Sequence, residues 1–238
     1  SLRDLTKSYK LDPHLSMIVD RYATYTGSDP RKAPAVLLTI AYVESTFGAW
    51  HISGGVGRLA QALEQRCLEL DVKIHLNTKV SQIITKDGAA IGIKLVNGDE
   101  IASDLIVTNA DSEITYNQLI NSDVRKAKKE RRKLRNASKS LAGFSLLLGL
   151  DNSKGDPVEL EHHNVFFPQD YDAEFDQIFD QKVPVTDPTI YICAPKDKSM
   201  VKGENKEAWF VLVNAPRHDP KNGWDWSING EQYAKQII

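Results

Sequence analysis

A chain of 238 residues is long enough for one large domain or two smaller ones. Its formal net charge of −2 gives no electrostatic reason to expect a nucleic-acid partner, and 41% hydrophobic with 26% charged residues is ordinary for a soluble protein. The chain has two cysteines, no apolar run near the ~20 residues of a transmembrane helix and no N-terminal signal pattern. We therefore expect a cytoplasmic protein without disulfides.

The N-terminal part of the chain predicts two helices separated by the turn Gly27–Pro30. The first helix, with Pro13 near its start, carries an apolar stripe made of Leu11, Leu15, Ile18 and Tyr22. The second helix begins near Pro34, and its apolar stripe is made of Val36, Leu37, Ile40, Val43 and Phe47. Packing in a domain core explains both stripes.

The stretch Ser53–Asp111 organises the middle of the chain. It opens with the turn Gly54–Gly57, whose glycines permit a tight bend and close approach of the backbone to another group. A helix is expected next, with an apolar face made of Leu59, Leu63, Cys67 and Leu70. A half-buried strand should follow, because apolar and polar residues alternate at Val72, Ile74 and Leu76.

The same stretch closes with a hairpin and a buried strand. An Asn-Gly turn at Val96–Asp99 separates the alternating runs 90–96 and 100–107. Ser103–Val107 is a short apolar run with little alternation, which is typical of a buried parallel strand. Residues 109–111 then lie where strands of α/β sheets end and bind ligands. A helix cap explains Asp111 equally well.

The second half predicts a short helix at Ser112–Ile120, a basic helix and a mixed sheet. Arg125–Arg135 holds eight basic residues in eleven. Such a run is typical of a solvated helix face, or of a segment on an anionic membrane, where each Lys or Arg contributes on the order of 1 kcal/mol. Strands are expected at Leu141–Leu150, Thr189–Ala194 and Ala208–Val213. The fold class is therefore a mixture of α and β elements.

No motif indicates catalysis or metal binding outright. His162 and His163 would point to opposite faces of a strand, and no cysteine or carboxylate has ligand spacing to them, so we expect no metal site. The chain contains no nucleophile–base pair or Walker loop. His51, next to the glycine turn, is interpreted as structural, and no catalytic residue is assigned.

The order of turn, helix, strand, hairpin and strand resembles the second part of the nucleotide-binding domain in FAD-dependent amine-oxidase-like enzymes. Among these, the chain is similar to the bacterial-type phytoene desaturase (carotenoid desaturase) family. The similarity runs from about Leu11 to Trp226 and is carried by Gly27–Pro34, Thr39–Trp50, Gly54–Gly57, Ser103–Asp111 and Tyr191–Pro195.

The resemblance implies FAD as the cofactor. It implies that FAD is bound by Gly54, Gly55, Val80, Asn109, Ala110 and Asp111. Residues 53–111 would form part of a Rossmann-like FAD-binding domain, while 1–52 and 112–238 would form a substrate domain with the mixed sheet and the basic helix. The chain lacks the Gly-x-Gly-x-x-Gly motif that opens such domains. We therefore expect an internal part of a longer enzyme, and weak FAD binding by this part alone.

The resemblance also implies desaturation of long isoprenoid hydrocarbons, of the phytoene or diapophytoene type, in carotenoid biosynthesis. It places the two N-terminal helices over the substrate channel, which is an alternative to packing in a domain core. The flavin would take the hydride while the protein supplies binding and orientation. A substrate drawn from a bilayer fits attachment of Arg125–Arg135 to the cytoplasmic membrane. Two alternatives stay open: another flavin branch (carotenoid isomerase, retinol saturase, amine or protoporphyrinogen oxidase), or a non-enzymatic module for a hydrophobic ligand. The substrate, the electron acceptor and the oligomeric state are left undetermined.

Overall fold

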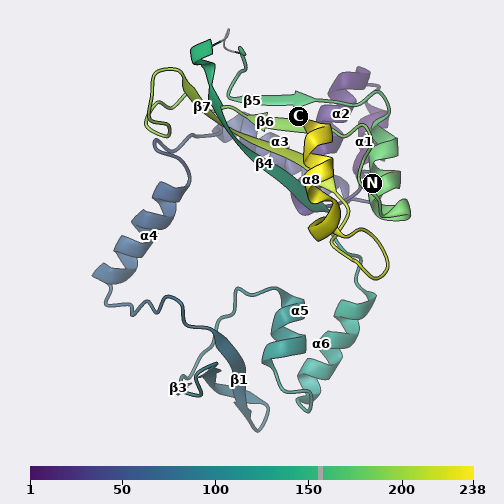
Figure 1. Cartoon of the computed structure of the whole chain (residues 1–238). Coiled ribbons are helices and arrows are strands. Elements are labelled where there is room, and N and C mark those ends of the chain that lie inside the picture. Colours follow the sequence, from purple (N-terminus) through teal and green to yellow (C-terminus); the bar gives the residue numbers. More distant parts are fainter. Residues whose placement is uncertain (155–157) are drawn as a thin grey trace. The chain divides into compact units, whose positions relative to one another are not determined.

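The computed structural model describes residues 1–154 and 158–238, and it divides into two compact units (Figure 1). The first unit is made of Ser1–Ala62 and Ser140–Ile238, and the second of Leu63–Lys139. Each unit combines helices with one antiparallel sheet, which confirms the predicted mixture of α and β elements. The predicted functional domains, 1–52, 53–111 and 112–238, stay a prediction.

The first unit is built on a four-stranded sheet. In spatial order, its strands are β4 (Ala142–Asp151), β7 (Lys206–Ala215), β6 (Ile190–Cys193) and β5 (His163–Phe166). All three neighbouring pairs are antiparallel. The predicted mixed sheet, which would contain parallel as well as antiparallel neighbours, is therefore wrong. Residues 194–205, which join β6 to β7, contain no helix, and parallel neighbours usually need a crossover of that kind.

One face of this sheet is covered by α8 (Trp226–Ile237), which lies against β4 in Figure 1. The ring of Phe144 on β4 stacks 5.1 Å from Trp226 and meets Tyr233 edge-on at 5.2 Å. Burial alternates along β4 as the sequence predicts, because successive strand residues face opposite sides. On β7, Val211 and Val213 complete the buried layer.

The N-terminal helices form a small core of their own. They are α1 (Leu2–Ser8), α2 (Pro13–Arg21), the 3₁₀ turns η1 (Tyr22–Thr26) and η2 (Ala35–Leu37), and α3 (Leu38–Phe47). Leu2, Ala23 and Ala33 are buried together. Arg3 pairs with Asp20 of α2 and with Asp172, which belongs to α7 (Tyr171–Phe175). The π-helical turn η5 (Asp176–Gln181) continues α7.

The apolar stripes predicted for α2 and α3 are only partly in this core. On α2, Leu15 and Ile18 are exposed, and on α3 so are Val43 and Phe47. Core packing is therefore the wrong explanation for these side chains. They leave apolar surface open on both helices, and that surface is available to a ligand or to a further part of a protein.

The second unit contains the predicted hairpin in a three-stranded antiparallel sheet. Its strands are β1 (Val80–Lys86), β2 (Ala89–Leu95) and β3 (Glu100–Ala102), in that spatial order. At the predicted Asn-Gly turn between β2 and β3, Asn97 Oδ1 accepts the backbone N–H of Asp99. The expected helices are present as α5 (Ser112–Ile114), the π turn η3 (Thr115–Leu119) and α6 (Arg125–Asn136).

Two predicted strands are absent from the described residues of this unit. The segment at Val72–Leu76, after α4 (Gly57–Glu69), and the run Ser103–Val107 are not strands. The backbone N–H of Ser103 still donates to Ile91 of β2 at 3.0 Å, and the chain leaves the sheet after it. Leu105 is 77% exposed and Val107 is 85% exposed. A strand exists through its neighbours, so apolar patterning without an adjacent strand produces an extended, uncovered segment. Among the described residues, no helix has the length and apolar character needed to cross a bilayer.

Candidate flavin-turn site

The predicted glycine turn lies between Ile52 and the start of α4, in the first unit. Gly54 has φ +81° and Gly55 has φ +87°, a region that side chains rarely tolerate. A Cβ at Gly55 would also come within 3.1 Å of the Met200 methyl group. Both positions therefore require glycine. Gly55 is buried against Met200, and Gly54 is half-buried beside the Arg58 side chain.

One carboxylate fixes this turn. Asp197 Oδ2 accepts the N–H of Gly54 at 2.7 Å and lies 3.0 Å from His51 Nε2. Asp197 Oδ1 accepts the hydroxyl of Ser199 at 2.5 Å and its backbone N–H at 2.8 Å. The Ser199 hydroxyl, followed by Gly54 and His51, holds the pKa of Asp197 well below its ordinary value. Asp197 is therefore ionised at neutral pH and anchors the turn.

Asp197 is the residue that sequence reasoning missed at this site. The local pattern of Asp197 followed two residues later by Ser199 is a recognisable Asx turn. Nothing local, however, connects Asp197 to Gly54, which lies 143 residues earlier in the chain.

The side chains around the turn suit a flat apolar group. Trp50 is 87% exposed and Val56 is 77% exposed, and Leu59 on the first turn of α4 is also open. These uncovered apolar side chains next to the glycine turn offer a surface on which the ring system of a flavin can pack. The two glycines themselves are less accessible, because Met200 covers Gly55 and the Gly54 N–H is already used by Asp197.

The other four predicted cofactor residues belong to the second unit. Val80 is the first residue of β1 and pairs with Leu95. Asn109 and Ala110 lie outside helices and strands. Asp111 caps α5, because its carboxylate accepts the N–H of Glu113 at 2.7 Å. The cap interpretation of Asp111 is therefore correct, and the cofactor role of all six residues stays a prediction.

Three histidines cluster beside the turn. The ring of His162 meets that of His51 edge-on at 5.0 Å and lies 4.5 Å from that of His163. The expectation that His162 and His163 point apart is wrong, because His162 precedes β5 and the alternation of a strand does not reach it. Burial, with the neighbouring rings of His163 and His51, lowers the pKa of His162. His162 is thus neutral at pH 7.

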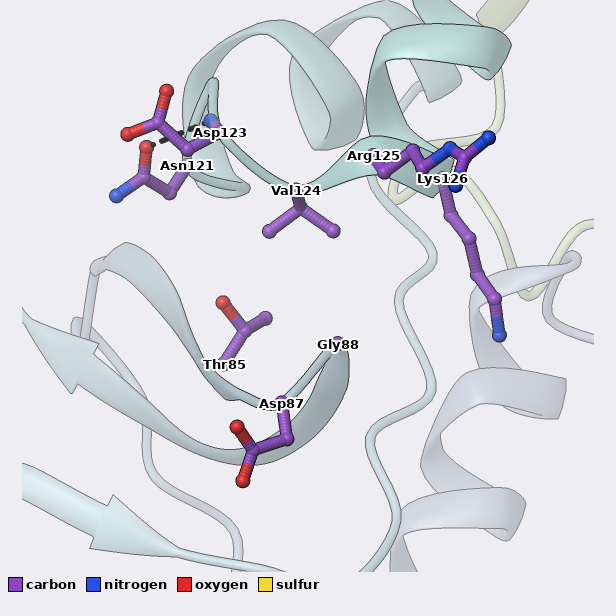
Figure 2. A pocket seen from close by; sticks show the side chains of 8 residues that line it. All are labelled: Thr85, Asp87, Gly88, Asn121, Asp123, Val124, Arg125 and Lys126. Atoms are coloured by element: carbon purple, nitrogen blue, oxygen red, sulfur yellow. Dashed lines mark hydrogen bonds between the residues drawn. The ribbon is translucent and has the colours of Figure 1, made fainter.

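The second unit has a hollow of about 540 Å³ between the β1–β2 turn and the start of α6 (Figure 2). Its lining consists of Thr85, Asp87, Gly88, Asn121, Asp123, Val124, Arg125 and Lys126. Val124 points toward the hairpin, while the remaining residues are mostly polar or charged. Such a lining does not suit a hydrocarbon, and it includes none of the six predicted cofactor residues.

The chain is similar to a family model and to several named proteins. Residues 11–145 match the family model described as flavin containing amine oxidoreductase. The chain is 33% identical over 224 residues to the 4,4'-diapolycopene oxygenase of Methylomonas sp, covering 94% of this chain and 43% of that protein. It is 32% identical to a 4,4'-diapophytoene desaturase of Methylomonas sp, over 90% of this chain and 41% of that protein. It is 34% identical to the zeta-carotene-forming phytoene desaturase of Myxococcus xanthus, over 95% of this chain and 42% of that protein. The chain spans less than half the length of these relatives.

Proposed function

Because the chain belongs to the flavin-containing amine oxidoreductase family, we propose that it forms part of an FAD-dependent desaturase acting on long isoprenoid hydrocarbons. Family membership implies FAD as the cofactor. The names of two relatives, a diapophytoene desaturase and a phytoene desaturase, support the substrate class. The reaction would oxidise a CH–CH unit of the hydrocarbon, as part of carotenoid biosynthesis.

The observation that carries this proposal is the glycine turn held by Asp197 beside uncovered apolar side chains. Gly54 and Gly55 adopt backbone conformations that side chains rarely tolerate, and Asp197 holds Gly54 in its conformation beside the exposed apolar side chains. Bound FAD supplies the acceptor for the hydride. The protein therefore needs to bind and orient the substrate and does not need a side chain that attacks it. This agrees with the lack of any nucleophile–base pair in the sequence.

A hydrocarbon offers no polar group, so its binding must come from apolar contact, at roughly 25 cal/mol for each Å² buried. The open apolar side chains of α2 and α3, among them Leu15, Val43 and Phe47, supply surface of this kind. The same surface would exclude water from the reacting carbon atoms. We assign no proton acceptor, and His51 serves in this proposal as a partner of Asp197.

Pigment formation tests the proposal directly. The full-length protein is loaded with FAD and mixed with liposomes carrying phytoene or diapophytoene, and the extracted pigment is examined by visible spectroscopy. New long-wavelength bands are expected, because each added double bond extends the conjugated system. Flavin binding without new bands would move the function to the isomerase or oxidase branches. Failure to bind flavin would contradict the enzyme proposal.

An oxygenase is the second candidate, because one relative is a 4,4'-diapolycopene oxygenase. The same assay separates the two when it is run under labelled dioxygen. A desaturase gives a pigment without the label, whereas an oxygenase gives a product that has gained labelled oxygen at the carbon chain. Mass spectrometry of the extract distinguishes them.

We also propose that α6 contacts an anionic membrane surface on the cytoplasmic side. Ala127 is buried, and Arg131 turns inward, where it donates to the carbonyl oxygens of Ile120 and Tyr116. The other seven basic residues of the helix are exposed. With one face packed and the rest cationic, α6 suits electrostatic docking rather than insertion. Sedimentation with anionic vesicles measures this contact.

A further inference from the structure

A ring nitrogen of His162, a ring nitrogen of His163 and the Cys193 thiol lie within 4.8 Å of one another, and we infer that these side chains bind a zinc ion. Histidine nitrogen holds zinc at about 2.0–2.1 Å and cysteine sulfur at about 2.3 Å, so tetrahedral ligands lie about 3.3–3.6 Å apart. Separations of up to 4.8 Å exceed that spacing, so zinc binding requires side-chain rotations that draw the three donor atoms together.

The sheet register makes this arrangement. His163 on β5 lies directly opposite Cys193 on β6, so their side chains share one face of the sheet. His162 comes immediately before β5, and its carbonyl oxygen accepts the N–H of Ala194 at 2.9 Å. Backbone hydrogen bonds therefore fix the strand segments that carry all three side chains.

The imidazole of His163 has a hydrogen-bond partner of the kind that orients a metal ligand. Tyr191, two residues before Cys193 on the same face, has its hydroxyl 2.8 Å from His163 Nδ1. The ring of His51 packs edge-on against His162, and Asp197 in turn holds His51. A hydrogen bond at one ring nitrogen fixes the orientation of an imidazole and leaves the other nitrogen for a metal.

The ligand set selects the metal. Two imidazoles and a thiolate suit zinc, whereas calcium and magnesium prefer carboxylate and carbonyl oxygen, and none of the three side chains carries either. Three protein ligands leave one tetrahedral position for water or another ligand. The site links the edge strand β5 to β6 beside the flavin turn, and the inference does not rest on the proposed desaturase activity.

Cobalt binding tests the inference, because Co²⁺ occupies zinc sites and gives a cysteinate charge-transfer band. Tag-free, reduced protein is titrated with Co²⁺ and then with Zn²⁺. We expect one equivalent of Co²⁺, with a charge-transfer band that Zn²⁺ abolishes. The band should disappear in Cys193→Ser and persist in Cys67→Ser, since Cys67 on α4 is the only other cysteine of the chain. A band that survives Cys193→Ser would overturn the inference.

The histidines are tested through affinity. His162→Ala and His163→Ala should each weaken Zn²⁺ binding by about tenfold or more, which is about 1.4 kcal/mol. His14→Ala, at an exposed position, is the matched control and should leave the affinity unchanged. Equal affinities in all three variants would overturn the inference.

A measurement on the unaltered protein guards against variants that fail to fold. Alkylation of both cysteines is followed by peptide mass spectrometry, with and without Zn²⁺. Zinc should slow the modification of Cys193 by about tenfold or more and leave Cys67 unaffected, because a metal-bound thiolate is a poorer nucleophile. Identical rates for Cys193 in the two conditions would contradict zinc binding.

Discussion

Asp197 accepts the backbone N–H of Gly54 with 2.7 Å between the two atoms, although 143 residues separate them in the chain. This bond ties the segment after β6 to the turn before α4. Hydrogen bonds to an ionised acceptor are stronger than neutral ones, so the contact restrains a glycine that would otherwise have wide conformational freedom. The geometry of the proposed flavin turn therefore depends on a residue outside it.

The first prediction concerns Asp197→Asn. The amide removes the charge and leaves one acceptor oxygen for hydrogen bonds that now use two. We expect FAD binding by the full-length protein to weaken by about tenfold, measured by flavin fluorescence. Asp219→Asn, in another loop where the carboxylate accepts the N–H of Asn222, is the control and should bind FAD normally.

The low pKa of Asp197 also sets the direction of a pH effect. The folded protein binds the proton less readily than the unfolded chain, so the stabilising effect of the ionised group is complete above the ordinary aspartate pKa of about 4. It is lost as the pH falls through the lower folded value. Equal FAD affinity for Asp197→Asn and Asp219→Asn at pH 7 would show that Asp197 does not position the turn.

The second prediction compares two glycines of the same turn. Gly55→Ala places a side chain at φ +87° and within 3.1 Å of Met200, so it should destabilise the protein by about 1–3 kcal/mol and weaken FAD binding. Gly57→Ala is the matched control, because a Cβ there meets nothing within 4 Å and the residue begins α4. It should be neutral or stabilise by up to about 1 kcal/mol. Urea unfolding measures both, and indistinguishable variants would rule out the strain argument.

Local patterns predicted the elements whose neighbours are also local. The Asn-Gly turn at Asn97 was enough to predict the β2–β3 hairpin, and the alternation of apolar residues was enough to predict β4. Both patterns reflect contacts made within one strand or with the strand next to it in the sequence. Ser103–Val107 has an equally good strand pattern and forms no strand among the described residues. Its pattern records a preference for burial, and among the described residues a neighbouring strand reaches only its first residue, Ser103, through Ile91.

The candidate site likewise has one part that the local sequence predicts and another that depends on distant contacts. The turn at Gly54 and Gly55 was predictable, since backbone freedom is a property of glycine itself. The roles of Asp197 and Cys193 were not, because they follow from the pairing of distant segments and from the β5–β6 register. A shift of one residue in that register would turn Cys193 away from His163, and no feature of the sequence fixes it.

The third prediction concerns the buried carboxylate of Glu174 on α7. Its oxygens accept the N–H of Thr189 and the amide of Asn214, each at 2.7 Å. Burial raises the pKa of Glu174 despite these bonds, and Arg21, Tyr171 and Tyr233 are the titratable groups near it. Glu174→Gln removes the charge and keeps an acceptor oxygen for Thr189, while a flip of the Asn214 amide lets its oxygen accept from the new NH2 group. We therefore expect it to stabilise the protein at pH 7 by roughly 1–2 kcal/mol.

The sign of the pH dependence follows from that raised pKa. The folded protein binds the proton more tightly than the unfolded chain, so the free energy of unfolding should fall as the pH rises from the ordinary glutamate pKa toward the folded value. Glu174→Gln should flatten this slope in urea titrations between pH 4 and 8. The exposed Glu204→Gln is the control and should keep the slope of the unaltered protein. A destabilised Glu174→Gln would mean that the charge itself is needed by the fold.

The last prediction concerns the exposed cationic face of α6. Lys128 and Arg132 are exposed one turn apart, whereas Arg131 is held by backbone carbonyl oxygens and is not available to a membrane. Changing both exposed residues to Gln should weaken binding to phosphatidylserine vesicles by about 25-fold, at about fivefold for each charge. The control changes Lys7 and Lys10, which are also exposed, and should have a much smaller effect. Binding of the unaltered protein should also fall with added salt, because exposed charges are screened. Equal losses for the two pairs, or equal binding to neutral vesicles, would show that α6 is only a solvated helix.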